Sequence, residues 1–286
     1  MERKVNALGF VNVDKPSGMT SSAVVNRVKW LTGLPCGHMG TLDPLASGVL
    51  PVGVGNATRL FDWFLDKEKE YVAEFVFGVT SDTLDTTGEL MPCGGVPSEG
   101  AVAAALPRFV GEIDQVPPRY SAKNVNGRRG YDLARAGVCF ELPPKRVKVY
   151  AFDLLGRSEE RADAFRFRIR CGGGTYIRSL ARDLGEALGT GGVMSALRRT
   201  QSGCFLIGGA VPFALLNEEN IEKYILPTEN TLPFPELSFS ENDRIFNGIP
   251  ARTAVPDGRY KAFRGGAFYG IAEVKGGRAK IATKLC

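Results

Sequence analysis

Apolar positions recur with two different spacings along the chain, and together they predict an α+β protein. Between residues 70 and 78 every second residue is Tyr, Ala or Phe, which is the spacing of a strand with one buried face. Residues 164–171 alternate in the same way, with arginine at positions 166, 168 and 170 on the polar face. We expect these arginines either to pair with nearby acids or to contact a nucleic-acid backbone. Further strands are predicted at residues 10–14, 49–54, 111–115 and 146–155.

Spacings of three and four residues predict helices over residues 21–34, 58–65 and 99–109, and a fourth helix after Gly174. In the first helix, Ser21 or Ser22 is the expected N-cap. In the second, Phe61 is expected to be buried. In the fourth, Thr175 is a suitable N-cap, which places Tyr176 and Arg178 in the first helical turn.

The pattern changes after a proline-bearing connector at residues 227–235. Beyond it lie short strand-like runs at residues 267–274 and 278–284, separated by two glycines. We therefore divide the chain into a domain spanning residues 1–235 and a small β-rich domain spanning residues 236–286.

Composition narrows the class of protein. With 286 residues, 44% hydrophobic and 23% charged, the chain is typical of a globular protein. It has no apolar stretch of membrane-spanning length, and we expect it to be cytoplasmic. The six cysteines are scattered, and His38 is the single histidine. Because metal-ligand spacing and nucleotide-binding motifs are both missing, we expect no metal and no cofactor, and carboxylates must carry the chemistry.

The charge distribution favours a polyanionic partner. There are 36 Lys and Arg residues against 31 Asp and Glu residues, a net charge of +5. Eight of the basic residues fall between Arg119 and Lys148, interleaved with tyrosines. A solvated charged surface and an RNA-binding surface explain this segment equally well.

The most distinctive stretch is residues 37–48, Gly-His-Met-Gly-Thr-Leu-Asp-Pro-Leu-Ala-Ser-Gly, which runs directly into an apolar segment. Pro44 biases Asp43 away from helical backbone angles, and the glycines permit sharp bends. The pattern predicts an ordered loop that holds the Asp43 carboxylate beside a buried strand. Its local chemistry is also that of a simple turn beginning at Asp43.

This stretch resembles the signature of the TruB-type pseudouridine synthases. Five further segments resemble motifs of the same family and occur in the same order: residues 14–21, 69–71, 117–122, 174–178 and 197–199. The resemblance implies a pseudouridine-synthase fold, with a mixed, largely antiparallel sheet flanked by helices, followed by a PUA-like RNA-binding domain.

The resemblance also implies roles for individual residues. Asp43 corresponds to the catalytic aspartate of the family, and Arg178 is expected to pair with it. The residues expected to bind substrate are Tyr71, Tyr176, Arg178, Leu197, His38 and Lys15. Tyr71, Tyr176 and Leu197 would contact the target base, and His38 would fill the gap that the base leaves in the RNA stack.

The activity implied is isomerisation of uridine to pseudouridine at position 55, in the T-loop of tRNA, after the base is flipped out of the RNA. The partner is the T-arm of tRNA, and no protein partner is predicted. Two other functions fit parts of the sequence. A non-catalytic RNA-binding protein would use the basic segment without requiring the Asp43 loop. A carboxylate-dependent hydrolase would use Asp43, but usually needs a second acid or a metal cluster.

Overall fold

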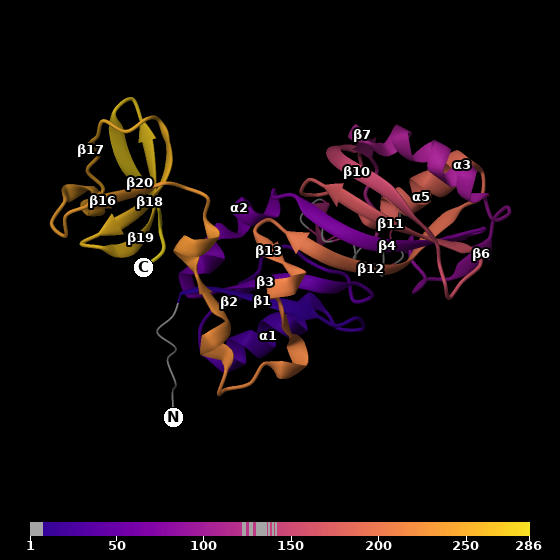
Figure 1. The fold of residues 1–286 in the computed structure, drawn as a ribbon, viewed down its shortest axis with the longest axis horizontal. Helices are drawn as coiled ribbons and strands as arrows, with labels where there is room; N and C mark the ends of the chain where they lie inside the picture. The colour runs from indigo at the N-terminus through magenta and orange to yellow at the C-terminus, as the bar shows by residue number, and fades with distance from the viewer. Residues whose placement is uncertain are drawn as a thin grey trace.

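The structure is a computed structural model that describes residues 8–121, 124–125, 128–129, 136, 138, 140 and 142–286. An eleven-stranded sheet forms its centre (Figure 1). Its main path runs through β14 (Val211–Pro212), β1 (Gly9–Lys15), β3 (Ser47–Val54), β12 (Gly192–Ser202), β4 (Lys69–Phe77), β11 (Ala164–Cys171), β10 (Lys145–Arg157) and β7 (Gly111–Gln115). Three short strands flank this path, namely β2 (Cys36–His38), β13 (Phe205–Leu206) and β15 (Ile225–Pro227).

The pairing within this sheet is mixed and largely antiparallel, as predicted. The pairs β1–β14 and β3–β12 are parallel, and the other pairs of the sheet are antiparallel. Strand β12 joins the two halves of the sheet, since it pairs with β3 at one end and with β4 along most of its length. Residues of β12 therefore lie between the N-terminal strands and the strands that follow.

Helices cover the sheet at two places. Helix α1 (Ser21–Thr32) packs on β1 and β3, while α3 (Glu99–Ala105) and α5 (Ile177–Leu188) pack on the other half. The short α2 (Phe61–Leu65) follows a 3-10 turn. Apolar side chains of α1, α5 and the sheet form one continuous core, which also includes Leu42, Tyr71 and Leu197. In Figure 1, α1 lies below the sheet and α3 and α5 lie at its opposite end.

Three local predictions were wrong. Helix α1 is capped by the Thr20 side chain rather than by a serine, and it ends at Thr32 because Gly33 adopts a left-handed conformation. Phe61 is 37% exposed, because the buried side of this turn is formed by Leu60 and Phe64. Thr175 does not cap α5; its hydroxyl donates to the Gly172 carbonyl, and Tyr176 occupies the N-cap position.

The predicted strand faces are confirmed. In β4 the residues at positions 71, 73, 75 and 77 are all buried. In β11 the three arginines are exposed, and Arg170 forms an ion pair with Glu68 at 3.4 Å, so the pairing interpretation holds for that residue.

A second sheet follows at the C-terminal end, in the order β16 (Glu236–Phe239), β18 (Gly258–Arg264), β19 (Ala267–Lys275), β20 (Arg278–Lys284) and β17 (Ala251–Arg252). It has its own small core around Ile245 and Tyr260. Ile271 and Leu285 pack against Phe64 and Leu232 of the preceding part of the chain, and Arg59 donates to the Lys284 carbonyl at 2.8 Å.

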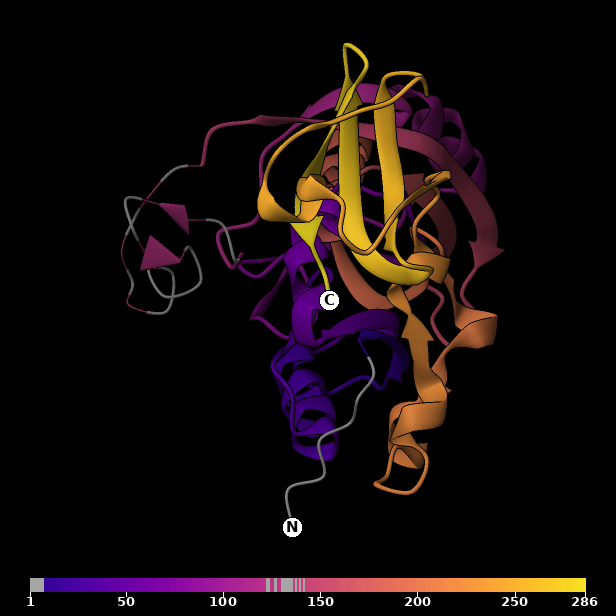
Figure 2. The ribbon, with the colours of Figure 1, turned by 90° about the vertical axis from the view of Figure 1, so that its left-hand side faces the viewer.

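Two further strand pairs lie outside both sheets. Strand β5 (Val79–Ser81) pairs with β6 (Leu90–Pro92), and β8 (Asn124–Val125) pairs with β9 (Arg128–Arg129). Figure 2 shows β8 and β9 standing away from the rest of the chain. Of the basic segment noted in the sequence, Lys123 and Arg135 lie outside the described residues. Within the described ranges, no helix combines the length and apolar character that crossing a membrane would require.

Candidate active site

The loop that carries Asp43 connects β2 to β3, and the turn between β1 and α1 fixes its backbone. The Ser21 hydroxyl donates to the Leu42 carbonyl at 2.8 Å and accepts from the Leu42 amide at 2.9 Å. The Gly18 amide donates to the Pro44 carbonyl at 2.8 Å. The main chain is thus anchored on both sides of Asp43, while the Asp43 side chain remains 37% exposed.

Arg199 on β12 supports the same loop from the core. Its guanidinium is buried and donates to the Val49 carbonyl at 2.7 Å and to the Gly40 carbonyl at 3.0 Å. Its backbone lies so close to Gly48 that a Cβ at that position would come within 2.2 Å of the Arg199 carbonyl oxygen. Gly48 also has φ +99°, a conformation that favours glycine. Glycine at position 48 therefore allows β3 to approach β12 directly after the loop.

Lys15 is fully buried beneath the loop rather than placed on an open surface. Its ammonium group donates to the carbonyls of Met19 at 2.6 Å, Pro16 at 2.9 Å and Pro44 at 3.4 Å. Burial lowers the pKa of Lys15 to about 8, and the Asp43 carboxylate partly opposes this shift. The geometry is that of a residue supporting the Asp43 loop.

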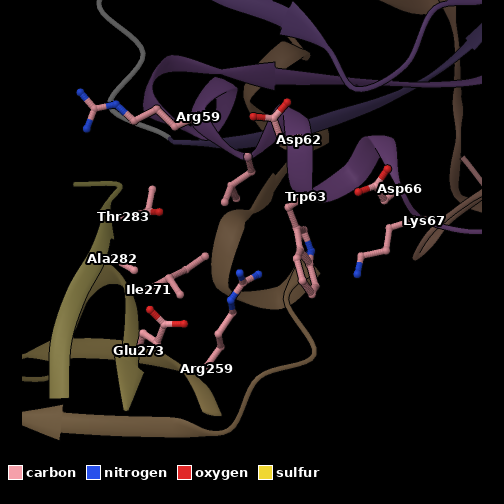
Figure 3. Close-up of a pocket in the computed structure, with 11 residues that line it drawn as sticks. Arg59, Asp62, Trp63, Asp66, Lys67, Arg259, Ile271, Glu273, Ala282 and Thr283 are labelled. Carbon is pink, nitrogen blue, oxygen red and sulfur yellow. The ribbon is translucent and has the colours of Figure 1, made fainter. Parts of the chain in front are cut away.

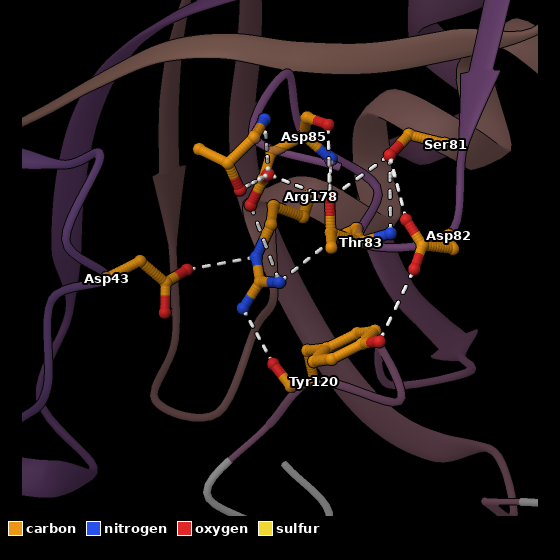
Figure 4. A network of polar contacts seen from close by, with 8 residues as sticks. Asp43, Ser81, Asp82, Thr83, Asp85, Tyr120 and Arg178 are labelled. Atoms are coloured by element: carbon orange, nitrogen blue, oxygen red, sulfur yellow. Dashed lines mark hydrogen bonds and ion pairs between the residues drawn. The ribbon is translucent and has the colours of Figure 1, made fainter. Parts of the chain in front are cut away.

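Arg178, in the first turn of α5, faces Asp43 as predicted (Figure 4). Its Nε lies 2.9 Å from a carboxylate oxygen of Asp43, and its side chain is only 7% exposed. The same guanidinium donates to the carbonyls of Thr83 and Tyr120, both at 2.9 Å, and lies 3.6 Å from the Asp85 carboxylate. The guanidinium is therefore held in one orientation by four groups.

Asp85 is a member of this network that the sequence analysis missed. Its carboxylate is buried and accepts hydrogen bonds from the hydroxyls of Thr83 at 2.8 Å and Thr87 at 2.5 Å, and from the Thr87 amide. Leu84 has φ +62° and so turns the chain sharply between Thr83 and Asp85, both of which reach Arg178. The alternation Thr-x-Asp-x-Thr at residues 83–87 was a usable signal for this network.

Tyr71 and Leu197 lie on adjacent strands near the loop. Tyr71 on β4 is paired with Arg199 on β12, and Leu197 lies two residues earlier on β12. They are 6% and 8% exposed, so each shows only an edge to solvent. Burial raises the pKa of the Tyr71 hydroxyl to about 12, and the nearby Asp43 charge contributes in the same direction.

Tyr176 and His38 are both half-buried. Burial raises the pKa of the Tyr176 hydroxyl, and the negative charge of Asp43 acts in the same direction. His38 lies in β2 opposite Val52, and burial lowers its pKa. Among the described residues, its Nδ1 has no hydrogen-bond partner.

A cavity of about 420 Å³ lies elsewhere, between α2 and the second sheet (Figure 3). Trp63 stands in its wall, with Lys67 and Arg259 against the indole ring. Asp62, Asp66 and Glu273 also line the cavity, so its wall carries both positive and negative side chains. It includes none of the predicted site residues and is separate from the Asp43 site.

The sequence and the fold were compared with those of known proteins. Residues 29–177 match the profile of the TruB family pseudouridylate synthase N-terminal domain, and residues 178–233 match that of the tRNA pseudouridylate synthase B C-terminal domain. The chain is 38% identical over 275 residues to tRNA pseudouridine synthase B of Clostridium kluyveri, covering 92% of this chain and 94% of the relative. It is 42% identical over 246 residues to that of Clostridium acetobutylicum, covering 84% of each.

Among solved structures, the chain resembles one described as the crystal structure of a Cbf5-Nop10-Gar1 complex. The TM-score is 0.71 at 28% identity, and the match covers 97% of this chain and 85% of the other. It also resembles a structure of an H/ACA RNP bound to a substrate RNA containing 2′-deoxyuridine, with a TM-score of 0.70 at 26% identity.

Proposed function

Because this chain belongs to the TruB family of pseudouridylate synthases, we propose that it isomerises uridine 55 in the T-loop of tRNA, with Asp43 as the catalytic carboxylate. The names of its relatives support tRNA as the substrate. The T-loop position follows from the sequence resemblance. The observation that carries the assignment of Asp43 is its ion pair with a fixed guanidinium at the edge of the core.

The reaction breaks the bond between ribose C1′ and uracil N1 and forms a bond between C1′ and C5. The hydrogen on C5 leaves as a proton, and N1 gains one, so there is no net oxidation and no group is transferred from outside. A carboxylate has two suitable roles, as a nucleophile on the sugar or the base, or as a base that removes a proton. The Arg178 guanidinium lies 2.9 Å from the Asp43 carboxylate and orients it for either role.

The target base must leave the RNA stack to reach this carboxylate. Unstacking a nucleotide costs a few kcal/mol, and stacking on an aromatic ring returns about 1 to 3 kcal/mol per base. We assign this contact to Tyr71 and Tyr176, with Leu197 as an apolar wall and His38 at the rim. The half-buried position of Tyr176 suits a ring that contacts the base on one side and the protein on the other.

We propose that the second sheet is the PUA-type RNA-binding domain, and that the catalytic domain ends near residue 235, one residue before β16 begins. We also propose that the enzyme acts in the cytoplasm and without a protein partner.

The test uses purified protein and a uridine-containing T-stem-loop RNA. The unaltered protein should convert the target uridine to pseudouridine. The Asp43→Asn variant should lose at least about 10³-fold in single-turnover rate, because the amide is a poor nucleophile and base. Its RNA affinity should stay within about threefold.

The outcomes separate the competing functions. Turnover that survives in the Asp43→Asn variant would exclude Asp43 as the catalytic residue. RNA binding by the unaltered protein without pseudouridine would favour a non-catalytic RNA-binding role, and cleaved RNA would favour a hydrolase.

A further inference from the structure

Helix α5, whose first turn carries Arg178, begins without a side-chain N-cap hydrogen bond. A helix start leaves backbone amides without partners, and an N-cap oxygen usually accepts from one of them. The N-cap residue here is Tyr176, whose side chain forms no capping hydrogen bond. Its backbone is extended, with φ −101° and ψ 112°. Another group must therefore keep this turn in place.

Gln115 provides that group. It is the last residue of β7 and is 1% exposed. Its side-chain carbonyl accepts from the Tyr176 amide at 2.8 Å, and its side-chain amide donates to the Tyr176 carbonyl at 3.1 Å. A single side chain thus forms both hydrogen bonds that a neighbouring strand would offer to an extended residue. A reversed amide would meet two like groups, so the pairing also fixes its orientation.

The consequence for the site is geometric. Tyr176 precedes the first turn of α5, which carries Arg178, and fraying of that turn would move both the tyrosine ring and the guanidinium. A displacement of about 1 Å at a reacting centre lowers rates by on the order of 100-fold. The carbonyl of Tyr176 also accepts from the Leu180 amide at 3.2 Å, so fixing this residue fixes the first hydrogen bond of the helix.

We propose that Gln115 is a positioning residue, which holds the backbone of Tyr176 so that Tyr176 and Arg178 meet the base beside Asp43. This inference rests on the function proposed above. Gln115 does not touch the reacting atoms, and its effect passes through Tyr176.

The experiment compares three variants. Gln115→Leu removes both hydrogen bonds. Gln115→Glu retains an acceptor for the Tyr176 amide, but regains a donor for the carbonyl only when protonated. Ser179→Ala is the matched control, because Ser179 lies in the first turn of α5 and its hydroxyl donates to the Val116 carbonyl at 2.8 Å rather than to Tyr176. Both interactions therefore link α5 to the end of β7.

We expect Gln115→Leu to lose about 10- to 100-fold in single-turnover rate at saturating RNA, with RNA affinity within about threefold. The rate of Gln115→Glu relative to the unaltered protein should rise as the pH falls, because the protonated side chain restores both hydrogen bonds. Ser179→Ala should stay within about threefold. If Ser179→Ala loses as much rate as Gln115→Leu, or if Gln115→Glu shows no relative gain at lower pH, the positioning role is wrong.

Hydrogen exchange separates this inference from the proposed function. In Gln115→Leu the amides of Tyr176 and Leu180 should exchange at least about tenfold faster, while Ser179→Ala leaves them protected. These exchange rates are expected whether or not the protein isomerises the RNA. Should Gln115→Leu fail to fold, the same comparison is made with Gln115→Glu at neutral pH. Unchanged exchange in the folded variant overturns the inference.

Discussion

The two charged groups at the centre of the site are held in opposite ways. Asp43 is fixed through its main chain, by Ser21, Gly18 and the residues beneath the loop, and its carboxylate remains 37% exposed. Arg178 is fixed through its side chain, which is 7% exposed and bonded to two carbonyls. The difference indicates that the two residues have different roles. The carboxylate keeps an open side, as its proposed catalytic role requires, whereas the guanidinium is held by its neighbours.

The largest combined effect on rate and stability should come from Arg178→Met. This change removes the partner of Asp43 and leaves the buried Asp85 carboxylate without its cation. Breaking a buried pair costs about 3 to 5 kcal/mol of stability, and loss of a fixed cation at a reacting centre costs about 10² to 10³ in rate. Single-turnover kinetics and urea denaturation measure the two quantities.

Asp43→Asn is the matched control for that experiment, since it should lose rate while its stability changes by less than about 1 kcal/mol. Equal losses of stability in the two variants would contradict the idea that Asp43 and Arg178 are held in different ways.

A smaller effect is expected for Asp85→Asn. The isosteric change keeps the shape of the loop, and Arg178 retains the Thr83 and Tyr120 carbonyls. We expect a loss of about 1 to 3 kcal/mol from weakened buried hydrogen bonds and about a 10-fold lower rate. The same two measurements apply. A rate as low as that of Arg178→Met would mean that Asp85, and not the carbonyls, orients the guanidinium.

The smallest effect on rate is expected for Lys15→Met, and its stability effect should depend on pH. Burial lowers the pKa of Lys15 from 10.5 to about 8. Between pH 8 and 10 the folded chain has released this proton and the unfolded chain still holds it, so stability rises with pH through this residue. The stability of the unaltered protein minus that of the variant should therefore increase over this window. Lys69, whose pKa is also about 8, is present in both proteins and cancels. A constant difference would contradict the buried position of Lys15.

The parts of the fold that could be predicted are those set by local pattern. The alternation in β4 and the helical spacing in α5 each reflect one buried face, and the structure has both. The cap of α1 was missed because Thr20 and Ser21 can both supply the capping oxygen, and that of α5 because no adjacent side chain supplies one. Local pattern does not decide among them.

The supporting residues of the site were missed for a different reason. Arg199 and Gly40 are 159 positions apart in the sequence, and Gln115 and Tyr176 are 61 apart. Such contacts depend on the order of the strands in the sheet, which the spacing of apolar residues along the sequence does not reveal. The pairing of Arg178 with Asp43 was accessible only through the family resemblance. Lys15 was predicted to bind substrate from its place in a motif, whereas its burial beneath the loop is a property of the packed structure.

The position of β12 between the two halves of the sheet has a consequence for how the protein forms. The loop at residues 40–48 rests on a strand that is synthesised about 150 residues later. Contacts so distant in sequence form slowly, because a long loop must close before they contribute. A nascent chain that ends before residue 199 lacks the part of β12 on which the Asp43 loop rests. Competence to modify RNA should therefore not appear during synthesis before β12 has inserted into the sheet.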